Sequence, residues 1–203
     1  MRIKSASSTP GSLGRPRSEV ARQAILEAAN ELLSSNGFSA LTVEAIAAKA
    51  GVSKATIYRW WNSKASVVMD GFLAATAPNI PFPNTGSVRE DFRRQMQTVV
   101  DLFNSPIGRT IAALIAEGQN DPELAEAFRS RYLAARRTEA KHILQRGIVG
   151  QELRSDLDLD VVLDALYGPL YYRLLVGHAP LDPHFVNMLV DLLMLAISAS
   201  PSK

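Results

Sequence analysis

The side chains with the clearest chemical use lie in residues 53–64, which read SKATIYRWWNSK and combine cations with hydroxyl groups. Lys54 and Arg59 can donate hydrogen bonds to guanine O6 and N7 or to phosphate oxygens, and Thr56 can meet a thymine methyl group or a base edge. The small side chain of Ala55 would let this helix come close to the DNA. On the first turns of a helix, these residue types favour contact with base pairs in the major groove of DNA. The alternative is that the cations only solvate an exposed helix.

A second set of side chains suits the phosphate backbone, where contacts fix the register of a protein without reading sequence. Thr42, Tyr58 and Lys64 belong to this set, because they carry hydroxyl or ammonium groups at the edges of the same segment. Ser53, at the start of the second helix, completes the predicted contacts of this segment with double-stranded DNA.

These side chains can reach DNA together only if two short helices that cross at a steep angle present them. The surrounding sequence predicts such a helix-turn-helix. Thr42 and Ser53 stand where each helix begins, and the side-chain oxygen of such a residue caps free amide groups. Gly51 lies between the helices, at a sharp reversal that requires a positive φ. Apolar residues recur where the two helices would touch, at Ile46, Ala50, Val52, Ile57 and Trp60.

Residues 18–77 resemble the DNA-binding domain of TetR-family transcriptional regulators. The matching residues are VARQAILEAANELLSSNGF at 20–38, Thr42-Val43, AGVS at 50–53, Thr56-Ile57-Tyr58, Trp61 and Ser63-Lys64. The resemblance implies that Tyr58 contacts phosphate, that Trp61 is a core aromatic residue, and that Lys64 opens a fourth helix beside the DNA backbone. Arg59 and Trp60 depart from the commonest form of the family, which has a second aromatic residue and a histidine there. The base preference therefore does not carry over.

The resemblance extends into the rest of the chain, since residues 167–186 (YGPLYYRLLVGHAPLDPHFV) are similar to one C-terminal subgroup of the family. The family joins a three-helix head through a fourth helix to a larger helical body that dimerises and often encloses a ligand. It implies a homodimer that binds a near-palindromic operator and is released by a small apolar or aromatic effector. A repressor is favoured, because a dimer seated over a promoter excludes polymerase.

Residues 1–17 are rich in Ser, Gly and Pro and contain four cations with no acidic residue. Such a composition cannot bury enough apolar surface to order a chain, so we expect a disordered basic arm. Arg15 and Arg17 lie in a Gly-Arg-Pro-Arg tetrad that resembles arms laid into the minor groove by some DNA-binding domains. A plain solvated tail is the alternative.

The expected fold is all-α and has two domains. Residues 18–77 form the helix-turn-helix head with its connecting helix, and residues 78–86 form a linker, because three prolines there disrupt helical hydrogen bonding. Residues 87–200 form a helical regulatory and dimerisation domain. Helical periodicity in that domain predicts helices near 87–104, 107–119, 122–147, 158–178 and 182–198.

The predicted body carries two candidate binding surfaces. Its last two helices are unusually apolar, and an exposed apolar face is usually covered by a partner. The predicted dimer interface comprises Val162, Leu166, Leu170, Leu174, Phe185, Leu189, Leu192 and Leu193. The predicted lining of a ligand pocket comprises Met96, Phe103, Phe128, Tyr132, Tyr167 and Tyr171, with His178 as a polar handle. The alternative for both sets is that they fill the core of the monomer.

Charge is uneven along the chain. Residues 1–64 hold nine Lys or Arg against four Asp or Glu, whereas the remaining residues hold thirteen against sixteen. The excess of positive charge therefore lies where a polyanion would bind. It is modest, which argues against the alternative of a non-specific nucleoid or accessory protein that uses the head as a basic clamp.

Other functional classes find little support in the sequence. It has no Cys, no phosphate-binding glycine loop, no GxSxG and no HExxH, and its three His residues share no metal-ligand spacing. We expect no metal, no cofactor and no enzymatic activity, an all-α enzyme being the least favoured alternative. Charged residues interrupt every long apolar stretch, so we expect no membrane span. The first seventeen residues contain no apolar stretch typical of a secretory signal, so we expect none. The expected location is the cytoplasm, in association with the nucleoid.

Overall fold

The computed structural model describes residues 15–76 and 82–199, and this part of the chain is helical with no extended strand. A single isolated β-bridge joins Leu153 to Ser198 within it. The predicted all-α fold is confirmed. In chain order the elements are α1 (Arg15–Ala40), α2 (Val43–Ala50), α3 (Lys54–Tyr58), α4 (Lys64–Thr76), α5 (Val88–Phe103), α6 (Pro106–Gly118), α7 (Pro122–Ala127), the π-helix η2 (Phe128–Leu133), α8 (Ala134–Val149), α9 (Leu159–Val176) and α10 (Pro183–Ile197).

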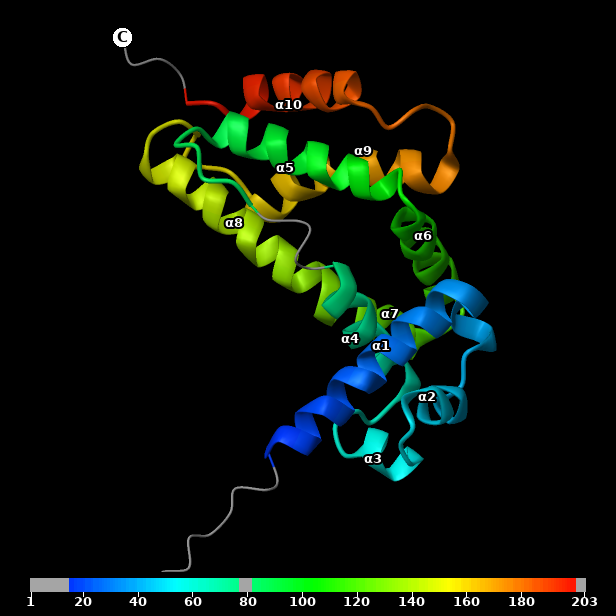
Figure 1. Cartoon of the computed structure of the whole chain (residues 1–203). Helices are drawn as coiled ribbons and strands as arrows, with labels where there is room; N and C mark the ends of the chain where they lie inside the picture. Colours follow the sequence, from blue (N-terminus) through cyan, green and yellow to red (C-terminus); the bar gives the residue numbers. More distant parts are fainter. Residues whose placement is uncertain (1–14, 77–81, 200–203) are drawn as a thin grey trace, which may run out of the picture.

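Two groups of helices lie at opposite ends of the molecule (Figure 1). α2 and α3 lie beside α1 at one end, and α5, α8, α9 and α10 form a layered bundle at the other. α4 packs against α1 on one side and against α7 and η2 on the other. This helix therefore belongs both to the head, which comprises α1 to α3, and to the body, which comprises α5 to α10.

The capping residues set the boundaries of the helix-turn-helix. The side chain of Thr42 accepts a hydrogen bond from the Ala45 amide at 3.1 Å, and α2 begins at the next residue. The hydroxyl group of Ser53 accepts from the Thr56 amide at 3.2 Å in the same way. Between the helices, Gly51 has φ 67° and ψ 31°, a left-handed conformation that other residues adopt only with strain. These residues fix where α3 starts and how sharply the chain turns before it.

The first helix overlaps the last three residues of the predicted basic arm. Because α1 starts at Arg15, the prediction of a disordered arm is corrected for residues 15–17, and its residues 1–14 lie outside the described part of the chain. Pro16 does not prevent this helix, because the first turn needs no amide donor from it. Helical geometry breaks at Gly37, where φ is 74° and ψ is 172°.

The backbones of α1 and α4 come very close at Gly71. A Cβ atom added there would lie 2.7 Å from the Leu26 carbonyl oxygen and 3.1 Å from the Ala29 side chain. Any larger residue would push the two helices apart, since a packed core does not absorb extra volume cheaply. This crossing of small residues therefore sets how the head is mounted on α4.

The segment before α5 is held against the body by a buried carboxylate. Asp91 is fully buried and accepts hydrogen bonds from the backbone amide of Thr85 at 2.7 Å and from its hydroxyl group at 2.8 Å. Arg146 in α8 pairs with the same carboxylate. The linker predicted at 78–86 falls partly on residues 77–81, which lie outside the described part, and its boundaries stay a prediction.

A π-helix divides the long helix predicted at 122–147 into α7, η2 and α8. The Ala134 amide donates to the carbonyl group of Arg129, five residues back, where an α-helix would use the fourth. Around this wider turn Phe128 and Tyr132 are buried together, with ring centroids 5.1 Å apart. Apolar periodicity does not distinguish a single π turn from a continuous helix, so this turn could not be predicted from the sequence.

Burial corrects half of the predicted dimer interface. Val162, Leu166, Leu170 and Leu189 are buried in the core of this chain, so they have no surface to offer a partner. Leu174, Phe185 and Leu193 are half-buried, and Leu192 is exposed. The large apolar side chains that α9 and α10 do expose are Val161, Tyr172, Leu175, Val176, Met188, Leu192 and Leu195.

Among the described residues, no single helix is long and apolar enough to cross a membrane. Only α5 and α6 taken together pass that test of length and composition, and the two helices are bent by 84° from one another.

Candidate DNA-binding surface and ligand pocket

The predicted DNA-binding side chains of the helix-turn-helix lie on its surface. Those that are exposed are Thr42, Ser53, Lys54, Ala55, Tyr58 and Arg59, and those that are half-buried are Thr56 and Lys64. Ile57, on the inner side of α3, is buried and anchors the helix in the core. Arg15 and Arg17 belong to α1, but the positions of their side chains lie outside the described part of the structure. The contacts of all these residues with DNA stay predictions.

Lys54 is held by an acidic side chain of the neighbouring helix. Its Nζ lies 2.8 Å from Oε1 of Glu44 in α2, and both side chains are more than half exposed. The hydrogen bond from Lys54 lowers the pKa of Glu44, and the same bond raises the pKa of Lys54. Both groups are therefore charged at neutral pH, and a carboxylate stands beside the surface that phosphate groups would approach.

Three other predicted contact residues, Ser53, Thr56 and Lys64, already take part in the structure of the head. The Ser53 and Thr56 hydroxyl groups lie 3.0 Å apart, so Thr56 shares a hydrogen bond at the start of α3. Lys64 donates to the Phe38 carbonyl oxygen at 3.0 Å, and its Nζ lies 3.9 Å from the centre of the Phe38 ring. Lys64 therefore ties α4 to the segment that precedes α2, besides its predicted contact with phosphate.

Asp70 of α4 links the helix-turn-helix to the body. Its Oδ2 accepts a hydrogen bond from Nε1 of the buried Trp61 at 2.7 Å, and its Oδ1 pairs with Arg131 of η2 at 2.6 Å. The resemblance indicated Trp61 as a core residue, but sequence reasoning missed Asp70 and Arg131. They lie 61 positions apart, and no local pattern pairs two such distant charges.

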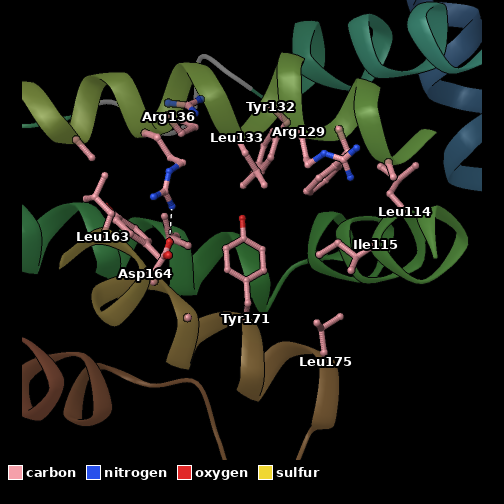
Figure 2. Close-up of a pocket in the computed structure, with 18 of the residues that line it drawn as sticks. Leu114, Ile115, Arg129, Tyr132, Leu133, Arg136, Leu163, Asp164, Tyr171 and Leu175 are labelled. Atoms are coloured by element: carbon pink, nitrogen blue, oxygen red, sulfur yellow. Dashed lines mark hydrogen bonds and ion pairs between the residues drawn. The ribbon is translucent and has the colours of Figure 1, made fainter. Parts of the chain in front are cut away.

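A pocket of about 460 Å³ opens inside the body between α5, α6, α8 and α9 (Figure 2). Four predicted lining residues, Phe128, Tyr132, Tyr167 and Tyr171, lie in its wall, and their role with a ligand stays a prediction. The remaining three do not line it. Met96 and Phe103 are buried in the core, and His178 is exposed beside Tyr172, so the prediction is corrected for them.

The uncharged polar groups of the pocket are phenols and amides in a mostly apolar wall, to which Arg129, Arg136, Arg137 and Asp164 add charged groups. Tyr167 donates a hydrogen bond to Oε1 of Gln95 at 2.5 Å, and the hydroxyl group of Tyr171 points toward Tyr132 across the pocket (Figure 2). Burial raises the pKa of all three tyrosines. The phenols are therefore neutral hydrogen-bonding groups at physiological pH. Across residues 15–76 and 82–199, no group of three or more His, Asp or Glu side chains is placed to hold a metal ion.

The helix-turn-helix and the body both match known protein families. The profile described as "Bacterial regulatory proteins, tetR family" matches residues 25–69, and "Tetracyclin repressor-like, C-terminal domain" matches residues 82–193. The chain belongs to the TetR family. A TetR-family protein is a DNA-binding transcriptional regulator, so the predicted family and the predicted class of function are confirmed.

Relatives resemble this TetR-family regulator over most of its length. The "Uncharacterized HTH-type transcriptional regulator YdeS" of Bacillus subtilis (strain 168) is 45% identical over 177 residues, which cover 87% of this chain and 89% of the relative. The "DNA-binding transcriptional repressor TetR" of Mycobacteroides abscessus is 28% identical over 182 residues, which cover 89% and 95% of the two chains. The crystal structure of the TetR family transcription regulator SCO0332 superposes with a TM-score of 0.75 at 38% identity, covering 86% of this chain and 96% of that one.

Replacing Glu44 by Gln should tighten binding to DNA of any sequence by up to about fivefold, because it frees Lys54 and removes a negative charge that repels phosphate. Fluorescence anisotropy with a labelled random-sequence duplex at two salt concentrations measures the change. Asp101→Asn serves as the control, since it removes an exposed carboxylate from α5, at the opposite end of the molecule. Weaker binding by Glu44→Gln, or an equal gain in both variants, would contradict the prediction.

Proposed function

We propose that this regulator is a homodimeric repressor that binds a near-palindromic operator and leaves it when a small effector occupies the pocket in the body. The observation that supports this most directly is that α3 exposes side chains able to bond to base edges, while Asp70 joins the same head to η2, part of the pocket wall. A dimer seated over a promoter excludes polymerase without any further contact surface. One relative, from Mycobacteroides abscessus, is itself named a repressor.

The proposed dimer interface consists of the exposed apolar faces of α9 and α10, shifted from the predicted positions. Leu192 and Leu195 of α10 are 66% and 79% exposed, and Val161 and Val176 of α9 are 63% and 56% exposed. Apolar side chains this exposed over two neighbouring helices favour burial by a second chain. Two-fold symmetry would then place two α3 helices on one face of the DNA, where each would contact one half of a near-palindrome.

The proposed release of DNA runs through η2. Arg129, Phe128 and Tyr132 of this turn line the pocket, whereas Arg131 of the same turn pairs with Asp70. Any ligand that shifts the turn changes the position of Arg131. Asp70, which bonds to both Arg131 and the indole of Trp61, would then move Trp61, which follows α3 in the chain. A ligand lowers DNA affinity only by its differential affinity for the two arrangements, typically about 1 to 3 kcal/mol of coupling.

Binding of DNA and of an effector explains the proposed site residues, and no catalytic role is needed for them. Because its proposed partner is chromosomal DNA, we expect the protein in the cytoplasm, at the nucleoid. The competing function is a non-specific DNA clamp, for which the excess of positive charge in residues 1–64 is modest.

Purified protein should retain a few near-palindromic fragments from sheared genomic DNA of its own organism, at about 0.15 M salt with excess competitor DNA. Sequencing of the retained DNA identifies the operator and the regulated genes. On the selected site, Thr56→Ala and Arg59→Ala should each lose about 1 to 3 kcal/mol of discrimination between bases. Flat recovery, or equal losses on selected and random DNA, would favour the non-specific clamp.

Light scattering should give twice the mass of the chain for the natural protein at micromolar concentration. Leu192→Arg should give a monomer, because a dimer would bury an unpaired cation at great cost. Val149→Arg is the matched control, since Val149 is 85% exposed but lies at the end of α8. A dimeric Leu192→Arg variant would exclude this face as the interface.

Operator binding should slow amide hydrogen exchange in the head and also in residues 128–133 if Asp70 transmits the change. In Arg131→Gln the slowing should be confined to the head, because the link to Asp70 is removed. Arg129→Gln is the control, since Arg129 belongs to the same turn but pairs with Glu126 inside the body. If operator binding slowed amide exchange of residues 128–133 as much in Arg131→Gln as in the natural protein, the proposed route through Asp70 would be wrong.

A further inference from the structure

The charges in the pocket wall are already balanced by the protein. Arg137 pairs with Asp164 at 2.5 Å and with Asp160 at 2.7 Å (Figure 2 shows the contact with Asp164). Arg129 pairs with Glu126 at 2.8 Å. A charged ligand would lose its hydration on entering, and it would have to compete with these carboxylates or guanidinium groups for a counter-charge.

Arg136, the third arginine that lines the pocket, also has partners within the protein. It lies 3.4 Å from Glu139 in α8 and also takes part in further contacts within the chain. Each guanidinium group in the wall thus has protein partners, and burial keeps the tyrosines neutral. The wall therefore offers a ligand no charge that lacks a partner.

Uncharged hydrogen-bonding capacity remains at the centre of the pocket. Tyr171 points its hydroxyl group from α9 across the pocket toward Tyr132 on the opposite wall (Figure 2). A bond between these two hydroxyl groups would use only one of their two protons, so the pair keeps a donor for a third group. Tyr167 and Gln95 form a separate pair beside them.

The wall around the tyrosine pair is aromatic and aliphatic. Phe82 and Phe128 line the pocket with the tyrosines, and Leu114, Ile115, Leu133 and Leu175 contribute aliphatic surface. Flat aromatic faces favour a ring system, which stacks or packs edge to face against them. A volume of about 460 Å³ lies within the usual size of sites for small organic ligands.

We propose that the effector is an uncharged, ring-containing molecule with a carbonyl or similar acceptor, which accepts the spare hydroxyl proton of the Tyr132–Tyr171 pair. This inference rests on the proposed effector function and names the class of ligand that serves it. The same wall discriminates against organic anions and cations of equal size, since neither finds an unpaired counter-charge.

A matched pair of probes tests the class of ligand. Methyl 2-naphthoate is uncharged and has a carbonyl acceptor, whereas 2-naphthoate carries the same rings with a negative charge. Both compete with the fluorescent ketone 6-propionyl-2-dimethylaminonaphthalene, bound to the full chain without DNA. The ester should displace it at a concentration at least about tenfold lower than the acid does. Tighter binding of the acid would overturn the inference.

Variants locate the binding event. Tyr171→Phe should weaken the ester about fivefold, because it removes a hydroxyl partner, and Tyr132→Phe should do the same if its own hydroxyl supplies the proton. Tyr172→Phe should leave the affinity unchanged, since Tyr172 is exposed and lies outside the pocket. Ester binding that is unchanged in both Tyr171→Phe and Tyr132→Phe would refute the role of the hydroxyl pair.

A measurement of operator affinity with and without the ester distinguishes a failure of the proposed ligand class from a failure of effector release. Displacement that depends on the tyrosines supports the class of ligand even where DNA affinity stays constant, and constant affinity then counts against effector release alone. Release of DNA by the acid, with no release by the ester, would refute the class while supporting effector release.

Discussion

The contact on which the molecule depends most is the close approach of α1 and α4 at Gly71. Because no Cβ separates the two backbones there, α4 is fixed against the head along its length. Asp70 is the residue before this contact, and it reaches Trp61 on one side and Arg131 on the other. A larger residue at position 71 would therefore displace α4 from α1, and with it the residue that links α3 to the pocket wall.

Local signals in the sequence predicted the head and the helical class well. Thr42, Ser53 and Gly51 act within three or four residues of their own position, so their types and spacing are enough to predict the caps and the turn. Asp121 and Asp182 likewise cap α7 and α10 through their side chains, each followed by a proline at the first helical position. Such features depend on the backbone nearby and not on the rest of the fold.

Features that depend on distant contacts could not be predicted in this way. Leu166 and Leu192 belong to similar apolar helices, yet one is fully buried and the other is 66% exposed. The difference arises from how α9 and α10 pack on α5, which the periodicity of either helix alone does not contain. The Asp70 link was missed because Arg131 lies far away in the chain, and the π turn was missed because apolar periodicity does not distinguish it from a continuous helix. The family resemblance supplied the architecture, but it did not supply these contacts.

The exposed residues of α3 have a further consequence for the history of such a protein. Lys54, Ala55 and Arg59 contact DNA in the proposed function but contribute no buried surface to the head, since Ile57 and Trp61 anchor it. Substitutions at these positions can alter the preferred base sequence with little loss of folding stability. Descendants of one ancestral gene can therefore acquire new operators by a few surface changes, while the pocket and its connection to the head are inherited intact.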